Sequence, residues 1–152
     1  MGTKSSVDQL NSYLRGEMSA VETYRMAIAK LDTGSPARGD LEACLASHRD
    51  RVNLLRDAVI MLGGDPSDSS GPWGVFAKAV EGSARMFGDK AAIAALEEGE
   101  DHGLGDYKED LDELDTDSRR LVTDRLLPLQ QQTHDRISSL KKRLGNKQPG
   151  RA

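Results

Sequence analysis

The chain has 152 residues, the length of a single domain, and both charge signs contribute to the 30% of residues that are charged. The formal net charge of -4 gives no general attraction to nucleic acid or to an anionic membrane. The single cysteine, Cys44, excludes an internal disulfide, and the sequence has neither a membrane-spanning apolar run nor the apolar segment of a signal peptide. We therefore expect a cytoplasmic protein with no nucleic-acid or membrane partner.

The first half of the chain predicts two amphipathic helices. Core-type residues recur at alternating spacings of four and three, which places them on one inner stripe of each helix. This pattern predicts helices over residues 7–31 and 41–62. Ser5 or Ser6 can cap the first helix, and the glycines at 63–64 suit a left-handed end for the second.

A long connection follows, because residues 63–72 are rich in turn-forming types. It leads into a short amphipathic helix over residues 73–87, which carries Trp73, Phe76 and Phe87. Large aromatic side chains usually fill cores, so these residues either cover the bundle or mediate self-association into a homo-oligomer.

The second half predicts another helix pair. A third helix begins after Gly88, with Asp89 as a candidate N-cap, and its inner stripe runs to Leu114. Thr116 or Asp117 can cap a fourth helix that ends near residue 144. Its Pro128 predicts either a kink or a late start.

These elements predict an all-α fold, namely one four-helix-bundle domain over residues 1–144 followed by a tail at 145–152. Each of the four main helices carries one ionisable residue on the stripe that should be apolar. These residues are Glu17, His48, Glu100 and His134.

Burial of a lone carboxylate is costly, so such groups are normally paired, neutralised, hydrogen-bonded or bound to metal. Two carboxylates and two imidazoles that converge would suit Fe, Mn or Zn. A buried hydrogen-bonded network that fixes helix register is the alternative.

An internal repeat relates the two halves of the chain. Residues 16–25 and 99–108 both read Gly-Glu, six residues, Tyr and a basic residue. The repeat pairs Glu17 with Glu100 and places one tyrosine on the inner stripe of each helix.

The repeated segments, together with other motifs, resemble an uncharacterised bacterial family of ferritin-like four-helix-bundle proteins in the ferritin/rubrerythrin-like superfamily. The motifs are Gly16-Glu17 with Tyr24, LeuGlyGlyAspPro at 62–66, GluGluGlyGluAsp at 97–101 with Tyr107, and Gln131 with HisAspArgIle at 134–137. The resemblance implies a long crossover between the second and third main helices.

Ferritin-like di-iron proteins take one Glu from each of two helices and a Glu-x-x-His motif from each of the others. The resemblance assigns the single positions to Glu17 and Glu100, with Glu97 as an alternative to Glu100. Gln131 and His134 give Gln-x-x-His, in which an amide replaces a carboxylate.

The other motif is also incomplete, because Leu45 precedes His48 by three residues. We therefore expect no oxygen-activating centre and assign no catalytic residue. Two functions remain: a protein that binds a single Fe, Mn or Zn ion in the bundle core, or a metal-free bundle that acts as an interaction or stress-related scaffold.

Overall fold

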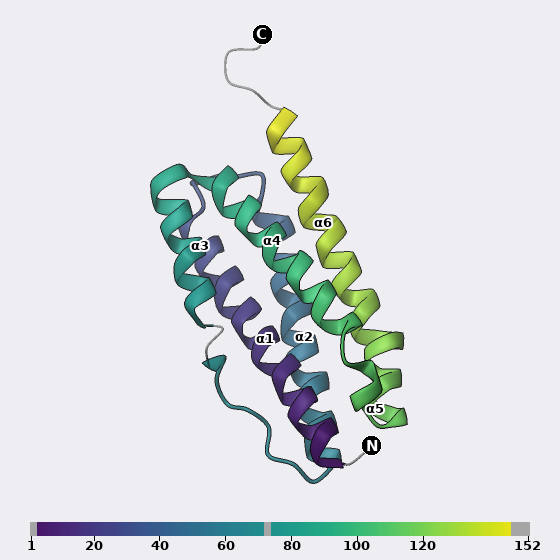
Figure 1. Cartoon of the computed structure of the whole chain (residues 1–152). Coiled ribbons are helices and arrows are strands. Elements are labelled where there is room, and N and C mark those ends of the chain that lie inside the picture. The colour runs from purple at the N-terminus through teal and green to yellow at the C-terminus, as the bar shows by residue number, and fades with distance from the viewer. Residues whose placement is uncertain (1–2, 72–73, 147–152) are drawn as a thin grey trace.

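A computed structural model describes residues 3–71 and 74–146, and all regular structure in these ranges is helical (Figure 1). The predicted all-α class is confirmed. In the described part of the chain, no helix is both long and apolar enough to cross a membrane. The principal helices are α1 (Thr3–Lys30), α2 (Arg38–Met61), α3 (Gly74–Phe87), α4 (Asp89–Lys108), α5 (Thr116–Leu121) and α6 (Leu127–Asn146).

The helices form a bundle in which α1 pairs with α2 and α4 pairs with α6. Further contacts join α1 to α4 and α2 to α6, and α3 packs along α1 and α4. In Figure 1, α1 and α6 run in one direction and α2 and α4 run in the other. The segment after α2 returns along the outside of the bundle, so that α4 starts at the end where α2 starts.

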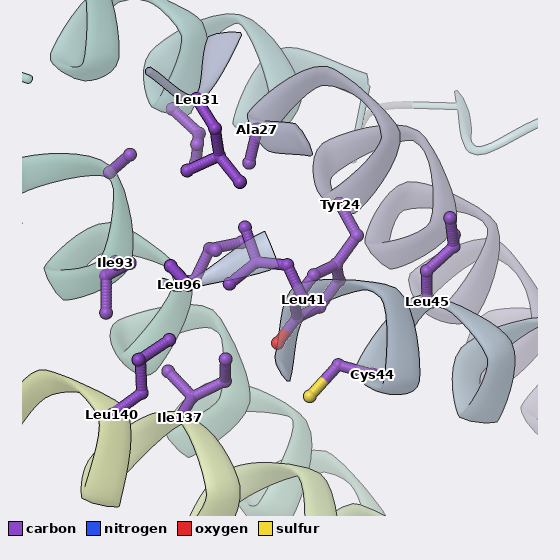
Figure 2. Packing of buried hydrophobic residues seen from close by; sticks show 13 residues of the cluster. Tyr24, Ala27, Leu31, Leu41, Cys44, Leu45, Ile93, Leu96, Ile137 and Leu140 are labelled. Atoms are coloured by element: carbon purple, nitrogen blue, oxygen red, sulfur yellow. The ribbon is translucent and has the colours of Figure 1, made fainter. Parts of the chain in front are cut away.

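Two apolar clusters fill the bundle. We call the first the Leu41 cluster; Figure 2 shows its side chains from α1, α2, α4 and α6 pointing toward one another. Its buried members are Tyr24, Ala27, Leu31, Ala37, Leu41, Cys44, Leu45, Val80, Ala92, Ile93, Leu96, Ile137 and Leu140. The second, which we call the Leu14 cluster, contains Leu10, Tyr13, Leu14, Leu55, Val59, Tyr107, Leu114, Val122 and Leu126.

The ends of the first two helices follow local chemistry. Ser5 and Ser6 lie inside α1, so their predicted capping role is wrong; the buried Ser6 Oγ instead accepts from the Asp115 backbone N–H at 2.8 Å. At the end of α2 the prediction is confirmed, because Gly63 has a left-handed φ of 80°. The N–H of Gly64 bonds the carbonyl of Val59 at 3.0 Å, which closes the helix as a Schellman motif.

The third main helix is shorter than predicted. Its N-cap is Gly88 rather than Asp89, and α4 ends at Lys108 because Glu109 is extended and Asp110 has a φ of 58°. The buried Leu114 therefore lies beyond the helix, after a short 3-10 turn at Leu111–Glu113.

The fourth main helix starts at Thr116. Its N-cap is Asp115, whose carboxylate accepts from the Ser118 N–H at 3.3 Å, and not Thr116 or Asp117. A π-helical turn at Val122–Leu126 joins α5 to α6, just before Pro128. Proline lacks an N–H and its ring clashes with the carbonyl four residues back, so the wider turn accommodates it without ending the helix.

The aromatic residues of the connection have different surroundings. Phe76 is partly buried and packs against the Leu41 cluster, as expected for a residue that covers the core. Phe87 is 72% exposed, and Trp73 lies outside the described residues, as do residues 147–152 of the predicted tail. Self-association stays a prediction.

Candidate functional site

Between the two apolar clusters lies a set of buried polar side chains that we call the polar layer. Every main helix contributes to it, and each member is at most 5% exposed. Its members are Glu17 from α1, His48 and Arg51 from α2, Glu100 from α4, and Gln130 and Thr133 from α6. Spacings of three and four residues place these side chains on the inner stripe of each helix, near the middle of the bundle.

His48 bridges the two buried carboxylates. Its Nδ1 lies 2.5 Å from Glu17 Oε2, and its Nε2 lies 2.9 Å from Glu100 Oε2. An ionised carboxylate only accepts hydrogen bonds, so both contacts are hydrogen bonds only when both ring nitrogens carry a proton. The geometry therefore favours the imidazolium form of His48.

Arg51 is fully buried and supplies the second cation. Its Nη1 donates to Glu17 Oε1 at 3.3 Å and also donates to Gln130 Oε1. Its Nη2 donates to Thr133 Oγ1 at 2.9 Å and to Ser47 Oγ at 3.1 Å. The guanidinium thus ties α2 to α1 and to α6.

The internal repeat forms a reciprocal pair across the α1 and α4 interface. Tyr24 on α1 donates from its hydroxyl to Glu100 Oε2 on α4 at 2.9 Å. Tyr107 on α4 donates to Glu17 Oε1 on α1 at 2.6 Å. Each repeat therefore supplies a carboxylate, and the other repeat supplies the phenol that satisfies it.

Two residues of α6 donate further hydrogen bonds to Glu100. Thr133 Oγ1 donates to Glu100 Oε1 at 2.5 Å, and Gln130 Nε2 donates to the same oxygen at 3.1 Å. Gln130 Nε2 also donates to the Glu100 backbone carbonyl at 2.9 Å, which fixes α6 against α4.

The two carboxylates are held in their ionised form. Burial alone would raise the pKa of Glu17, but the charges of Arg51 and His48 lower it to about 2. For Glu100 burial again opposes ionisation, and the His48 charge with hydrogen bonds from His48 and Thr133 leaves its pKa below the ordinary value.

The cations respond in the opposite sense. Burial lowers the pKa of His48, but the facing charges of Glu17 and Glu100 outweigh burial and the opposing charge of Arg51, and raise it. Two anions and two cations then balance, so the polar layer is close to neutral. A layer whose charges are paired avoids the large cost of an isolated buried charge, although the buried Nε of Arg51 has no hydrogen-bond partner among the described residues.

Three of the predicted site residues meet in this layer and three do not. Glu17, His48 and Glu100 converge as expected. His134 is partly exposed, and its Nε2 lies 2.5 Å from Asp101 Oδ1. Its prediction as a core residue is wrong.

The remaining two candidates also lie outside the layer. Gln131 is exposed and donates to Asp135 Oδ1 at 2.8 Å. Glu97 accepts from Ser138 Oγ at 2.6 Å and from Lys141 Nζ at 2.9 Å, on the outer side of the α4 and α6 pair.

The error on α6 has a simple cause. From Gln130 to Ile137, steps of four then three select His134, whereas steps of three then four select Thr133, and both fit a helix. Thr133 is the buried residue, at 4% exposure. Its short polar side chain gives no apolar signal by which the pattern could have chosen it.

Arg51 is the other residue that the pattern did not identify, because a fully buried arginine is rare. One signal was present: Arg51 lies three residues after His48, and Thr133 lies three residues after Gln130. Both pairs have the spacing of the Glu-x-x-His motifs that the ferritin-like resemblance implies.

The donor set does not fit a pair of metal ions. Of the six residues in the polar layer, two are carboxylates, and Arg51 places a permanent cation beside them. The carboxylates face opposite edges of the His48 ring, so a metal on either nitrogen would displace one of them. Over the described residues, no group of three or more His, Cys, Asp or Glu side chains is arranged to hold a metal ion.

Comparison of the chain with protein-family models, with curated proteins and with solved structures gives no match.

Proposed function

We propose that the chain is a ferritin-like four-helix bundle in which His48 and Arg51 take the place of metal ions, and that it acts as a metal-free binding protein. The observation that carries this proposal is the position of His48 and Arg51 between Glu17 and Glu100. In a di-metal protein the positive charge comes from the ions, whereas here it comes from side chains.

The helix order supports the ferritin-like part of the proposal. Two antiparallel helix pairs, α1 with α2 and α4 with α6, are joined by the long segment of residues 62–88. A single long crossover between two such pairs is typical of ferritin-like folds. The reciprocal tyrosine and glutamate contacts relate the two halves as a repeat would.

The register supports the replacement of metal by side chains. Glu17 and Glu100 occupy the single-glutamate positions, and His48-x-x-Arg51 and Gln130-x-x-Thr133 occupy the paired positions. Among the paired positions, histidine and glutamine replace the expected glutamates, and arginine and threonine replace the expected histidines. The exchange removes two negative ligands and adds two cations, His48 and Arg51, so the site needs no metal for charge balance.

A single-metal site is the competing function, because Glu17, His48 and Glu100 are metal-ligand types in contact. It requires His48 to lose a proton and to release one carboxylate before it can bind an ion. Anaerobic titration calorimetry with Fe(II), Mn(II) and Zn(II) separates the two functions. We expect no stoichiometric binding by the natural chain, and stoichiometric binding that Glu17→Ala abolishes would contradict the proposal.

A gain-of-function variant tests the register. The combined substitutions His48→Glu, Arg51→His, Gln130→Glu and Thr133→His restore two Glu-x-x-His motifs beside Glu17 and Glu100. We expect this variant to bind Co(II) with visible absorption bands of a protein-bound ion. The control adds Glu17→Ala to these substitutions and should weaken binding. A folded variant without Co(II) absorption would contradict the assignment of residues 48, 51, 130 and 133 to the Glu-x-x-His positions.

A further inference from the structure

A cavity of about 510 Å³ opens from the polar layer between α1 and α4, a volume within the range of small-molecule sites. Glu17, Glu100 and His48 lie at its inner side, and Gln130 reaches it from α6. Its lining extends along α1 from Gln9 to Tyr24, which corresponds to roughly 20 Å at the helical rise. The cavity is therefore an elongated groove above the buried charges, and we call it the α1–α4 groove.

Glycines shape the walls of the groove. A Cβ atom at Gly16 on α1 would meet no atom within 4 Å, so this wall is open where a side chain would otherwise project. On α4, a Cβ atom at Gly99 would lie 2.8 Å from the ring of Phe76, so this glycine lets α3 approach and cover one end. Gly103 similarly leaves room for Gln130.

Aromatic rings form part of the walls. Tyr13 and Tyr107 pack with ring centroids 5.0 Å apart, and Tyr24 and Phe76 line the part of the groove near α3. Aromatic faces attract organic cations through their negative π-systems. They also cover the methylene segments of such a molecule.

The charge of the lining is strongly one-sided. His48 and Arg51 offset the charges of Glu17 and Glu100. The other carboxylates of the lining are those of Glu98, Asp106, Glu109 and Asp110. The described lining includes no lysine or arginine, and its cationic types are His48 and His102. Burial raises the pKa of Asp106, and the negative charge of Glu109 adds to this effect against the opposing charge of His102.

We propose that the α1–α4 groove binds a linear aliphatic polyamine. Its ammonium groups would contact the carboxylates along the groove, and its methylene segments would lie against the tyrosine and phenylalanine rings. An anion would meet a repulsive field here. Because the lining carboxylates outside the polar layer extend from Glu98 on α4 to Asp110 just beyond its end and are not grouped as metal ligands, an extended multivalent cation suits them better than an inorganic ion.

This inference rests on the proposed function in one respect, since it requires Glu17 and Glu100 to face the groove without a metal ion. Different experimental results would contradict the proposed function and the polyamine proposal. Metal binding by the natural chain would contradict the proposed function, whereas absence of both metal and polyamine binding would leave that function standing and overturn this inference.

Titration calorimetry with spermidine tests the proposal directly, with tetraethylene glycol as an uncharged probe of similar length. We expect one spermidine to bind per chain and tetraethylene glycol to give no binding. Gly16→Leu fills the open wall and should weaken spermidine binding by about tenfold or more, which corresponds to about 1.4 kcal/mol. Gly105→Leu is the matched control, because Gly105 also has open space around it but does not line the groove, and it should bind as the natural chain does.

A second pair of variants covers the case in which Gly16→Leu does not fold. Asp106→Asn with Glu109→Gln removes two groove charges, and Asp57→Asn with Asp124→Asn removes two exposed charges elsewhere. We expect only the first pair to weaken spermidine binding. Absence of spermidine binding to the natural chain, or equal weakening by both pairs, would overturn the proposal, the latter because it marks general attraction to an acidic protein.

Discussion

At the scale of single residues, Arg51 is the side chain whose charge lowers the pKa of Glu17 most. It is fully buried and donates hydrogen bonds to acceptors from α1, α2 and α6. Together with His48 it offsets the charges of two buried carboxylates. Removal of either cation leaves a carboxylate in a medium that stabilises charge poorly.

Arg51→Met should therefore lower the free energy of unfolding by about 3–5 kcal/mol, as expected when one partner of a buried ion pair is removed. Urea denaturation followed by circular dichroism measures this change. Arg49→Met is the matched control on the same helix, where the side chain is exposed, and it should stay within about 0.5 kcal/mol of the natural chain. Similar effects of both substitutions would contradict the role of Arg51.

The pKa shifts of Glu17 and His48 predict that the free energy of unfolding is greatest at an intermediate pH and falls at both lower and higher pH. The pKa of Glu17 is about 2 in the folded chain, below its ordinary 4.5, so its contribution is present above pH 4.5 and is lost as pH falls toward 2. That contribution is on the order of 3 kcal/mol. The pKa of His48 is raised above 6.5, so its contribution is present below pH 6.5 and is lost as pH rises through the folded pKa.

Urea denaturation at a series of pH values measures the loss of stability on both the acidic and the alkaline side. We expect the greatest free energy of unfolding between about pH 4.5 and 6.5, the interval that the two ordinary values define. His48→Gln should remove most of the decline on the alkaline side. An alkaline limb that is identical in this variant would show that another group causes it.

At the scale of helices, the glycines of α4 have opposite roles. Gly103 faces Gln130, and a Cβ atom there would lie 2.5 Å from Gln130 Nε2, the atom that donates to Glu100. Gly105 has open space around it. The first glycine is needed for the contact of α4 with α6, whereas the second only weakens the helix.

Gly103→Ala and Gly105→Ala should therefore change stability in opposite directions. The first should destabilise the chain by about 1–3 kcal/mol, because it displaces Gln130 from its hydrogen bonds. The second should stabilise it by about 0.5–1 kcal/mol through helix propensity. Thermal unfolding of both variants measures the difference, and a stabilised Gly103→Ala would show that the α4 and α6 contact tolerates the added methyl group.

The helix ends were less predictable than the helices themselves. Apolar spacing identified the main helices because burial of a stripe dominates their energetics. The ends depend on single hydrogen bonds, and Ser6 had the chemistry of an N-cap but serves a tertiary contact with Asp115. Pro128 predicted a kink or a late start of the fourth main helix, and the structure has a π-helical turn at Val122–Leu126 instead.

At the scale of the whole molecule, the sequence predicted an all-helical bundle and located half of the polar layer. Glu17, His48 and Glu100 stood out because each interrupts an otherwise apolar stripe. Arg51 and Thr133 did not, because their burial depends on how neighbouring helices are rotated against each other. That rotation is set by packing between helices and is not contained in the periodicity of any one of them.

The groove between α1 and α4 was likewise beyond the reach of the sequence. Glycines in a helix indicate either close packing or a weak helix, and the spacing of Gly16, Gly99 and Gly103 does not distinguish a filled interface from an open one. The distinction comes from α3, which covers only one end of the α1 and α4 interface with Phe76. The position of α3 is a property of the assembled bundle.

The protonation state of His48 tests most directly whether side-chain cations replace metal ions in this bundle. Nitrogen-15 NMR of histidine-labelled full-length protein at pH 7, purified without a chelator, distinguishes an imidazolium from a neutral ring with one bare nitrogen. Because His48 lies between Glu17 and Glu100, we expect both of its ring nitrogens to carry protons, and we expect Arg51→Met to leave that signature or strengthen it. A neutral His48 ring, or a ring nitrogen bound to metal, would contradict the replacement of metal ions by side-chain cations.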